Sequence, residues 1–182
     1  MRRSTLLLTL AALVVLAVAV SQYRRSMREH YQKLDIERRD QWINETLTRI
    51  NQGDSRVQFY STANTDMMLE AIRGMPEVQT IVFEQAMDLS DEALKDLQSL
   101  PNLTRLEFRG QPEIDDESLS FIAQCQQVEV LIIRYCKVTD EGLPALARMR
   151  RLKELHHAGQ FSEQALTRLR ELLPGLITGA AL

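Results

Sequence analysis

The chain has 182 residues, 45% of them hydrophobic and 26% charged, which suits one modest domain with an accessory segment and excludes wholesale disorder. Its formal net charge of -3 excludes a generally basic nucleic-acid-binding protein. Two cysteines and three histidines exclude a disulfide-rich scaffold and a zinc finger or ribbon.

The charge is unevenly distributed along the chain. Residues 1–56 contain 10 Lys and Arg against 6 Asp and Glu, a local charge of +4, and residues 57–182 contain 12 against 19, a local charge of -7. The basic part surrounds an uncharged apolar run, Leu6–Val20. This arrangement indicates a membrane rather than a nucleic acid.

The apolar run predicts a membrane anchor. As a helix, its fifteen residues are about 23 Å long, and the neighbouring Ser4, Thr5 and Ser21–Tyr23 extend it to about 20 residues, the length that crosses a bilayer. Arginines flank it on both sides, and Tyr23 is placed as an interfacial anchor. We therefore expect residues 1–23 to form a transmembrane signal anchor.

A cleaved signal peptide is the alternative, because Ala17-Val18-Ala19 fits a cleavage site. Tyr23, Arg24 and Arg25 follow the run directly and favour an uncleaved anchor. More Lys and Arg follow the run than precede it, which favours a single-pass topology with the large domain on the cytoplasmic side. A periplasmic or exported domain is the alternative location.

Residues 24–55 are predicted to form a juxtamembrane or capping helix. No proline or glycine interrupts residues 22–52, and Trp42, Ile43, Leu47 and Ile50 form an apolar stripe at helical spacing. Such a helix either lies on a membrane surface or caps the first unit of the next domain, and capping is the plainer role.

Residues 56–182 contain a repeat. Leu89–Leu94, Ile114–Leu119, Val138–Leu143 and Phe161–Leu166 share one order: an apolar residue, a helix-capping residue, an acid, Glu or Gln, a small residue and leucine. With a degenerate first copy, Thr65–Leu69, the leading leucines are 25, 25, 24 and 23 residues apart. Periods of 20–29 residues are typical of leucine-rich repeats.

Each copy predicts one strand and one helix. Alternating apolar residues mark the strands: Val57/Phe59, Ile81/Phe83, Leu106/Phe108, Leu131/Ile133 and Leu155/His157. Good N-cap residues mark the helix starts: Thr65, Ser90, Asp115, Thr139 and Ser162. The acid after each cap faces the positive end of the helix dipole, and this single cause accounts for the acidic column without a metal site.

The middle of this region resembles a known family. Residues 128–143, VEVLIIRYCKVTDEGL, resemble the cysteine-containing class of leucine-rich repeats nearly position for position, and Cys125 falls at the second cysteine position of that class. The whole chain resembles small single-pass bacterial membrane proteins that carry such repeats. At the repeat position equivalent to Cys136, the other units have Thr62, Ala86, Gln111 and Gln160, so only one unit keeps the cysteine.

The resemblance implies an α/β fold, a short leucine-rich-repeat solenoid of about five strand-helix units with a parallel sheet on its concave side. The N-terminal transmembrane helix and the capping helix precede it. The last segment, Leu172–Gly179, departs from the pattern and is interpreted as a closing cap.

No catalytic residue, cofactor or metal ligand is predicted. Cys125 and Cys136 occupy core positions of the repeat, where a free cysteine behaves as a small hydrophobe. His156 and His157 are adjacent on a strand and so point to opposite faces. The sequence has neither a phosphate-binding glycine loop nor a nucleophile with a matched base, so it predicts no enzyme and no small-molecule substrate.

What remains is the concave surface, where the outward strand residues form the predicted protein-binding face: Val82, Glu84, Arg105, Glu107, Arg109, Val130, Ile132, Arg134 and His156. Apolar residues beside arginines suit a protein partner with an acidic group, although ordinary β-formers on an exposed sheet explain them equally well. The hypothesis is a membrane-anchored, non-catalytic protein-interaction module. The alternative is a self-associating structural protein at the membrane.

Overall fold

The protein is described by a computed structural model covering residues 2–60, 65–86 and 89–180, with side chains from residue 18 onward apart from residue 19. The chain divides into two compact units, Met1–Trp42 and Ile43–Leu182. The division falls within helix α1 (Arg2–Asn51), a single unbroken helix.

The described side chains of the first unit are largely exposed. Ion pairs one turn apart support the helix, Arg25 with Glu29 at 3.2 Å and Lys33 with Glu37 at 3.9 Å. Among the residues described, no helix combines the length and apolarity needed to cross a membrane. Most side chains of the predicted anchor, Leu6–Val20, lie outside that part of the chain.

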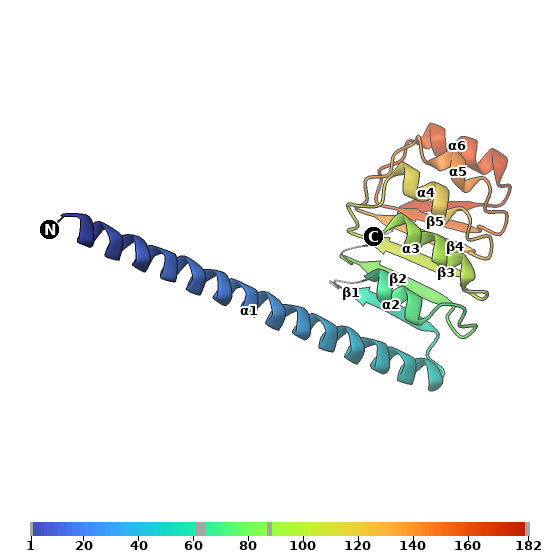
Figure 1. Cartoon of the computed structure of the whole chain (residues 1–182). Coiled ribbons are helices and arrows are strands. Elements are labelled where there is room, and N and C mark those ends of the chain that lie inside the picture. Colours follow the sequence, from blue (N-terminus) through green and yellow to red (C-terminus); the bar gives the residue numbers. More distant parts are fainter. Residues whose placement is uncertain (1, 61–64, 87–88, 181–182) are drawn as a thin grey trace. The chain divides into compact units, whose positions relative to one another are not determined.

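The second unit is a parallel six-stranded sheet with helices on one face (Figure 1). The strands lie side by side in chain order. Their bounds are β1 Arg56–Tyr60, β2 Thr80–Glu84, β3 Arg105–Arg109, β4 Val130–Arg134, β5 Glu154–His157 and β6 Ile177–Ala180. The helices between them are α2 Thr65–Ala71, α3 Asp91–Asp96 with a 3-10 turn Leu97–Ser99, α4 Asp116–Ile122, α5 Leu143–Leu146 and α6 Glu163–Leu172.

The strand register confirms the predicted apolar pairs. Val57, Ile81, Leu106, Leu131 and Leu155 lie opposite one another across five strands, and each is fully buried. The second column begins with Phe59, Phe83 and Phe108, whose rings stack at centroid distances of 5.0 and 5.2 Å. Because each unit buries its apolar face against the next, the core continues along the stack.

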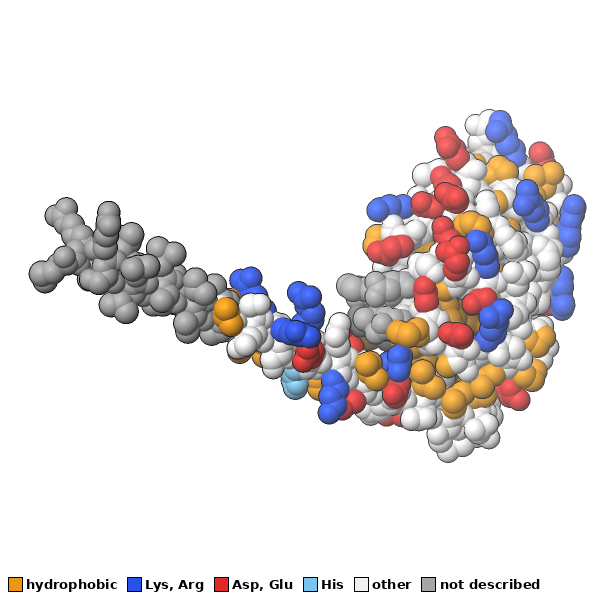
Figure 2. Space-filling model, in the orientation of Figure 1, with side chains coloured by type: hydrophobic (Ala, Val, Ile, Leu, Met, Phe, Trp, Pro, Cys, Tyr) orange, Lys and Arg blue, Asp and Glu red, His pale blue; other side chains and the backbone are white. Residues whose placement is uncertain are grey.

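The helices close this core from the other side. In each helix, apolar residues three positions apart are buried, as in Leu94 with Leu97 and Leu119 with Ile122. Figure 2 shows this helix-covered face, where acidic side chains gather toward the side on which the helices begin. The last turns of α1 belong to this unit, and Thr46 and Ile50 are buried within it.

The sheet has one strand more than predicted. Residues Ile177–Ala180, which we expected to lie in a closing cap, form β6 and pair with β5. The segment Ile-Thr-Gly-Ala has no alternation of buried and exposed residues, so the pattern did not identify it.

The predicted helix caps hold in three units. Ser90 and Ser162 accept hydrogen bonds from the backbone N–H three residues on, and Asp115 forms a capping box with Ser118. Thr139 instead accepts from the N–H of Glu141, because α5 begins only at Leu143. Thr65 lies within α2 and is buried.

The acidic column also joins neighbouring units. Asp66, Asp116 and Asp140 each accept a hydrogen bond from the backbone N–H of the next unit's capping residue, at 3.0, 2.7 and 2.8 Å. The hydrogen bonds from Ser162 lower the pKa of Asp140. These acids therefore link the strand-helix units in addition to facing a helix dipole.

Gly142 lies at a close contact between two units. A Cβ built there would lie 2.5 Å from Asp116 Oδ1, 2.7 Å from Leu119 Cδ1 and 3.2 Å from Asp116 Cα. The corresponding small residues in the other units are Ala93, Ser118 and Ala165. A glycine in this column thus lets α5 approach α4 closely.

We expect Gly142→Ala to lower the free energy of unfolding by about 1–3 kcal/mol, the usual cost of overpacking a closed contact. On an exposed helix the same change raises the free energy of unfolding by up to about 1 kcal/mol. The sign of the change therefore distinguishes a closed contact from an open one. Denaturant unfolding of the full chain in detergent measures it. A neutral or stabilising result would show that the two units separate easily at this contact.

Candidate functional site

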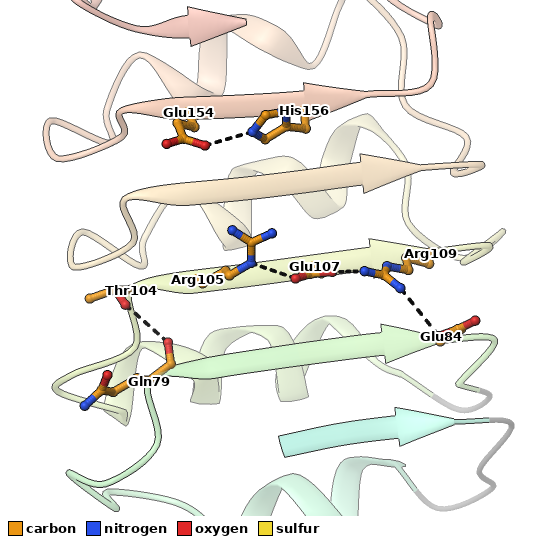
Figure 3. A network of polar contacts seen from close by, with 8 residues as sticks. All are labelled: Gln79, Glu84, Thr104, Arg105, Glu107, Arg109, Glu154 and His156. Carbon is orange, nitrogen blue, oxygen red and sulfur yellow. Dashed lines mark hydrogen bonds and ion pairs between the residues drawn. The ribbon is translucent and has the colours of Figure 1, made fainter. Parts of the chain in front are cut away.

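The predicted binding face lies on the side of the sheet opposite the helices, called here the open face (Figure 3). Six of its nine residues are half-buried: Glu84, Arg105, Arg109, Val130, Arg134 and His156. The other three, Val82, Glu107 and Ile132, are buried, with 0%, 1% and 5% of their surface exposed, so the expectation that outward strand residues meet solvent is wrong at these positions. Parallel strands lie about 4.8 Å apart, which is close enough for longer side chains at neighbouring positions to cover them.

An ion network runs along β3 on the open face. Glu107 accepts hydrogen bonds from Arg105 Nε at 2.7 Å and from Arg109 Nη2 at 2.5 Å, one on each carboxylate oxygen. Arg109 also reaches Glu84 on β2, with 3.8 Å between Nη1 and Oε2. Gln58 on β1 donates to the same oxygen of Glu84 at 3.3 Å. The network therefore joins three strands.

The network keeps the buried Glu107 carboxylate ionised. Burial alone would raise its pKa, but the hydrogen bond from Arg105 and the charges of Arg109 and Arg105 outweigh burial and lower the pKa below the ordinary value. Arg105 and Arg109 are therefore largely engaged within the chain. The hypothesis that a partner's acidic group binds beside the arginines of this face stays a prediction.

His156 does not join this network. Its Nε2 lies 2.9 Å from Glu154 Oε2 on the same strand, β5. The buried Ile132 on β4 separates it from Glu107 on β3. The open face thus carries two separate polar groups.

A hollow of about 300 Å³ opens where β2, β3 and β4 end. Its lining consists of the last residues of these strands and the residues that follow them: Glu84, Arg109 and Arg134, then Gln85, Gly110 and Tyr135. We call it the strand-end cavity. Tyr135 is 74% exposed at its edge.

The residues that follow the strands share an unusual backbone. Gln85, Gly110 and Tyr135 have φ angles of 50°, 62° and 56°, in the left-handed region that non-glycine residues seldom adopt. They occupy equivalent positions in three successive units, so the chain turns identically at each strand end. Sequence reasoning missed Gln85, Gly110 and Tyr135, although their shared position directly before the Ala86, Gln111 and Cys136 column was available as a signal.

Gln111 holds the backbone of Gln85, one of the residues that line the strand-end cavity. This fully buried side chain, oriented to satisfy both ends of its amide, donates to the carbonyl of Ala86 and accepts from the N–H groups of Ala86 and Gln85 at 2.7–2.8 Å. Gln160 similarly donates to the carbonyl of Ile133 at 3.1 Å. The two glutamines that replace the family's cysteine, Gln111 and Gln160, therefore form hydrogen bonds between units.

Two arginines and one glutamate line the strand-end cavity: Arg109, Arg134 and Glu84. Among the described residues, Arg109 Nε is buried without a hydrogen-bond partner. A buried donor of this kind gains from an incoming acceptor.

A second hollow, of about 320 Å³, lies on the helix side between α5 and α6. Leu143, Pro144, Ala165, Leu169 and Leu172 provide its apolar floor. Asp140 and Glu141 lie at its edge, with Arg168 also in the lining. Asp140 accepts a hydrogen bond from the backbone N–H of Ser162 at 2.8 Å.

The cysteines and His157 are poor candidates for chemistry. Burial raises the pKa of Cys125 to about 12 and that of Cys136 to about 11, so both remain protonated thiols at neutral pH. Burial also lowers the pKa of His157, whose Nδ1 accepts from the N–H of Gly159 at 3.1 Å. In the described part of the chain, no group of three or more His, Cys, Asp or Glu could hold a metal ion.

No family model matches the sequence, and no curated protein matches it significantly. Among solved structures, the chain is similar to a crystal structure of a Bacteroides fragilis protein from a structural genomics programme, with 17% identity and a TM-score of 0.34. The match covers 58% of this chain and 42% of the other, so it spans less than half of that protein.

Proposed function

We propose that this chain is a non-catalytic protein-binding module of the leucine-rich-repeat type, held at a membrane by its N-terminal segment. The observation that carries the binding proposal is the strand-end cavity. It combines an exposed tyrosine, two arginines and a buried unpaired donor at the ends of three adjacent strands.

The chemistry of the cavity suits an acidic side chain from a protein partner. A volume of about 300 Å³ is at the lower limit of small-molecule sites, and it is large enough for one or two protein side chains. Tyrosine and arginine are the residue types that dominate binding energy at protein interfaces. A carboxylate placed between Arg109 and Arg134 would accept hydrogen bonds from their guanidinium groups, the buried Nε of Arg109 among them, and the ring of Tyr135 would cover the aliphatic part of the incoming residue.

The membrane part of the proposal rests on the sequence of residues 1–23. Leu6–Val20 is uncharged, and arginines flank it. The excess of Lys and Arg after the run supports placing the repeat domain on the cytoplasmic side. Attachment to a membrane raises the effective concentration of a binder whose interface is small.

The test is capture of the full chain by a C-terminal tag from detergent-solubilised membranes, followed by mass spectrometry. We expect Arg134→Glu to reduce the recovered partner at least about tenfold, because it reverses the charge that faces the carboxylate. Tyr135→Asn should also weaken capture while the fold is retained, since asparagine tolerates a left-handed backbone. The mass of the intact chain reports at the same time whether the N-terminus is retained.

Arg150→Glu is the matched control, because it makes the same charge change at an exposed residue outside the strand-end cavity. Capture that survives both Arg134→Glu and Tyr135→Asn would contradict the proposed site. Capture that falls equally with Arg150→Glu would show a general charge effect. A mature chain that begins at Val20 would contradict the anchor and support an exported protein.

A further inference from the structure

The last strand presents an unprotected edge. β6 pairs with β5 on one side only, and among the residues that the structure describes no strand lies on its other side. Natural edge strands are protected by charged residues, proline or bulges, because their free N–H and C=O groups recruit further strands. The sequence of β6, Ile-Thr-Gly-Ala, contains none of these.

At the opposite edge of the sheet, side chains engage the first residue of β1. The backbone N–H of Arg56 donates to Asp54 Oδ1 at 2.9 Å, and its carbonyl accepts from Arg49 Nη2 at 3.2 Å. Arg49 and Asp54 also pair with each other. The backbone of Arg56 is therefore closed to a further strand.

The direction of these groups follows from the pairing with β5. The N–H of Ile177 donates to the carbonyl of Lys153 at 2.8 Å, so the backbone of Ile177 faces β5. Alternation along the strand then turns the N–H and C=O of Thr178 away from the sheet. Thr178 is the central outward position of this edge.

Apolar surface lies beside the edge. Ile177 is 63% exposed, and Leu172, at the end of α6, is 54% exposed. On α6, Arg170 pairs with Glu163 at 3.3 Å and donates to Thr178 Oγ1 at 3.0 Å. On the open face, Glu154 of β5 lies in register with Ile177, and its carboxylate is 2.9 Å from His156 Nε2. Arg170 and Glu154 therefore each have a polar partner within the chain.

We propose that a second copy of this chain pairs with β6, antiparallel to it, about a two-fold axis at Thr178. Each Thr178 would exchange both backbone hydrogen bonds with its symmetry mate, and the two six-stranded sheets would become one. This register places Ile177 opposite Gly179 of the second copy, where no side chain competes for space. A Cβ on Gly179 would lie 3.9 Å from its nearest neighbour, His156 Nδ1, so the position is open.

The occupant is a second copy because the edge complements itself. In this register, Ile177 of each chain lies opposite Gly179 of the other chain, and the two Thr178 residues lie opposite each other. Such a symmetric pairing is what an isologous interface requires. An isologous contact uses the β6 edge of both chains, so this contact closes at a dimer. The strands are only four residues long, and we expect a dissociation constant on the order of 10 µM.

Sedimentation of the full chain in density-matched nonionic detergent, at about 5–200 µM, tests the proposal. We expect the wild type to dimerise and Ile177→Lys to raise the dissociation constant at least about tenfold, because lysine is a natural blocker of strand edges. Tyr60→Lys is the matched control on the opposite terminal strand, since Tyr60 is 60% exposed, and it should behave as the wild type.

A second variant tests the register. Thr178→Cys should form an intermolecular disulfide under mild oxidation, because a symmetric antiparallel pair places the two Cα atoms about 5.5 Å apart. The wild type, whose own cysteines are buried or half-buried, is the control.

A monomeric wild type, a dimer unaffected by Ile177→Lys, or assemblies larger than two would overturn the proposal. A dimer in which Thr178→Cys does not cross-link would overturn the register. These results are independent of capture through the strand-end cavity.

Discussion

Replacement of Glu107 by alanine is expected to lower the free energy of unfolding by about 3 kcal/mol. Glu107 is 1% exposed and accepts from Arg105 and Arg109, so its removal leaves Arg105 without its carboxylate partner and Arg109 with Glu84 alone, 3.8 Å away. Removing one partner of a buried ion pair costs about 3–5 kcal/mol. We expect a loss at the lower end of this range, because both arginines are more than one third exposed and water screens their charges.

Glu107→Gln separates charge from shape, because glutamine keeps the size of the side chain and loses the carboxylate. We expect it to cost less than alanine. Replacing Arg105, Glu107 and Arg109 together by leucine should cost less than Glu107→Ala alone, since no charge is then left uncompensated. A loss below about 0.5 kcal/mol for Glu107→Ala would show that the arginines find other partners, and would contradict a structural role for the network.

The same carboxylate makes stability depend on pH. The pKa of Glu107 in the folded chain is below its unfolded value of 4.5, so its contribution is complete above that value and is lost as the pH falls through the folded pKa. The difference in unfolding free energy between the wild type and Glu107→Gln should therefore be constant near neutral pH and shrink under acid conditions. A difference that grows toward acid pH would contradict the assigned direction.

Replacement of Phe83 by alanine is expected to cost about 4 kcal/mol of unfolding free energy, the usual loss for a large buried aromatic residue. Phe83 is fully buried at the centre of the stack, with Phe59 and Phe108 on either side at 5.0 and 5.2 Å between ring centroids. Few small domains keep much stability after such a loss. Thermal or denaturant unfolding of the full chain measures it.

Two comparisons keep this prediction testable if Phe83→Ala does not fold. Phe83→Leu should cost about 1–1.5 kcal/mol and retain the fold. Phe121→Ala, at a half-buried ring outside the stack that contacts Lys95, should cost much less than Phe83→Ala. Equal losses for Phe83→Ala and Phe121→Ala would show that the stacked column is not the centre of the core.

Much of the fold could be predicted because burial repeats with the sequence. The strand pairs predicted from alternating residues lie in register, as Ile81 with Leu106 and Leu106 with Leu131. A repeat of 23–25 residues makes every unit bury the same positions, so one pattern locates the core of all five. β6 was not predicted, because a terminal strand has a neighbouring strand on one side only and its sequence does not alternate between buried and exposed residues.

The open face could be predicted only in part. The outward positions were identified correctly, but Val82 and Ile132 are buried and Glu107 binds two arginines. Burial on this face depends on the rotamers of side chains on neighbouring strands. The repeat pattern of the sequence does not predict these rotamers. The left-handed backbone at Gln85, Gly110 and Tyr135 was likewise not predicted, because only one of the three residues is glycine.

The sequence by itself determined the repeating core and its register, because hydrophobic burial is a property of each position and recurs with the period. Only the tertiary structure decided the ion network, the strand-end cavity and the open edge at β6. The link from Arg109 to Glu84, the meeting of three strand ends at the cavity and the position of β6 at the edge of the sheet arise only when successive units stack.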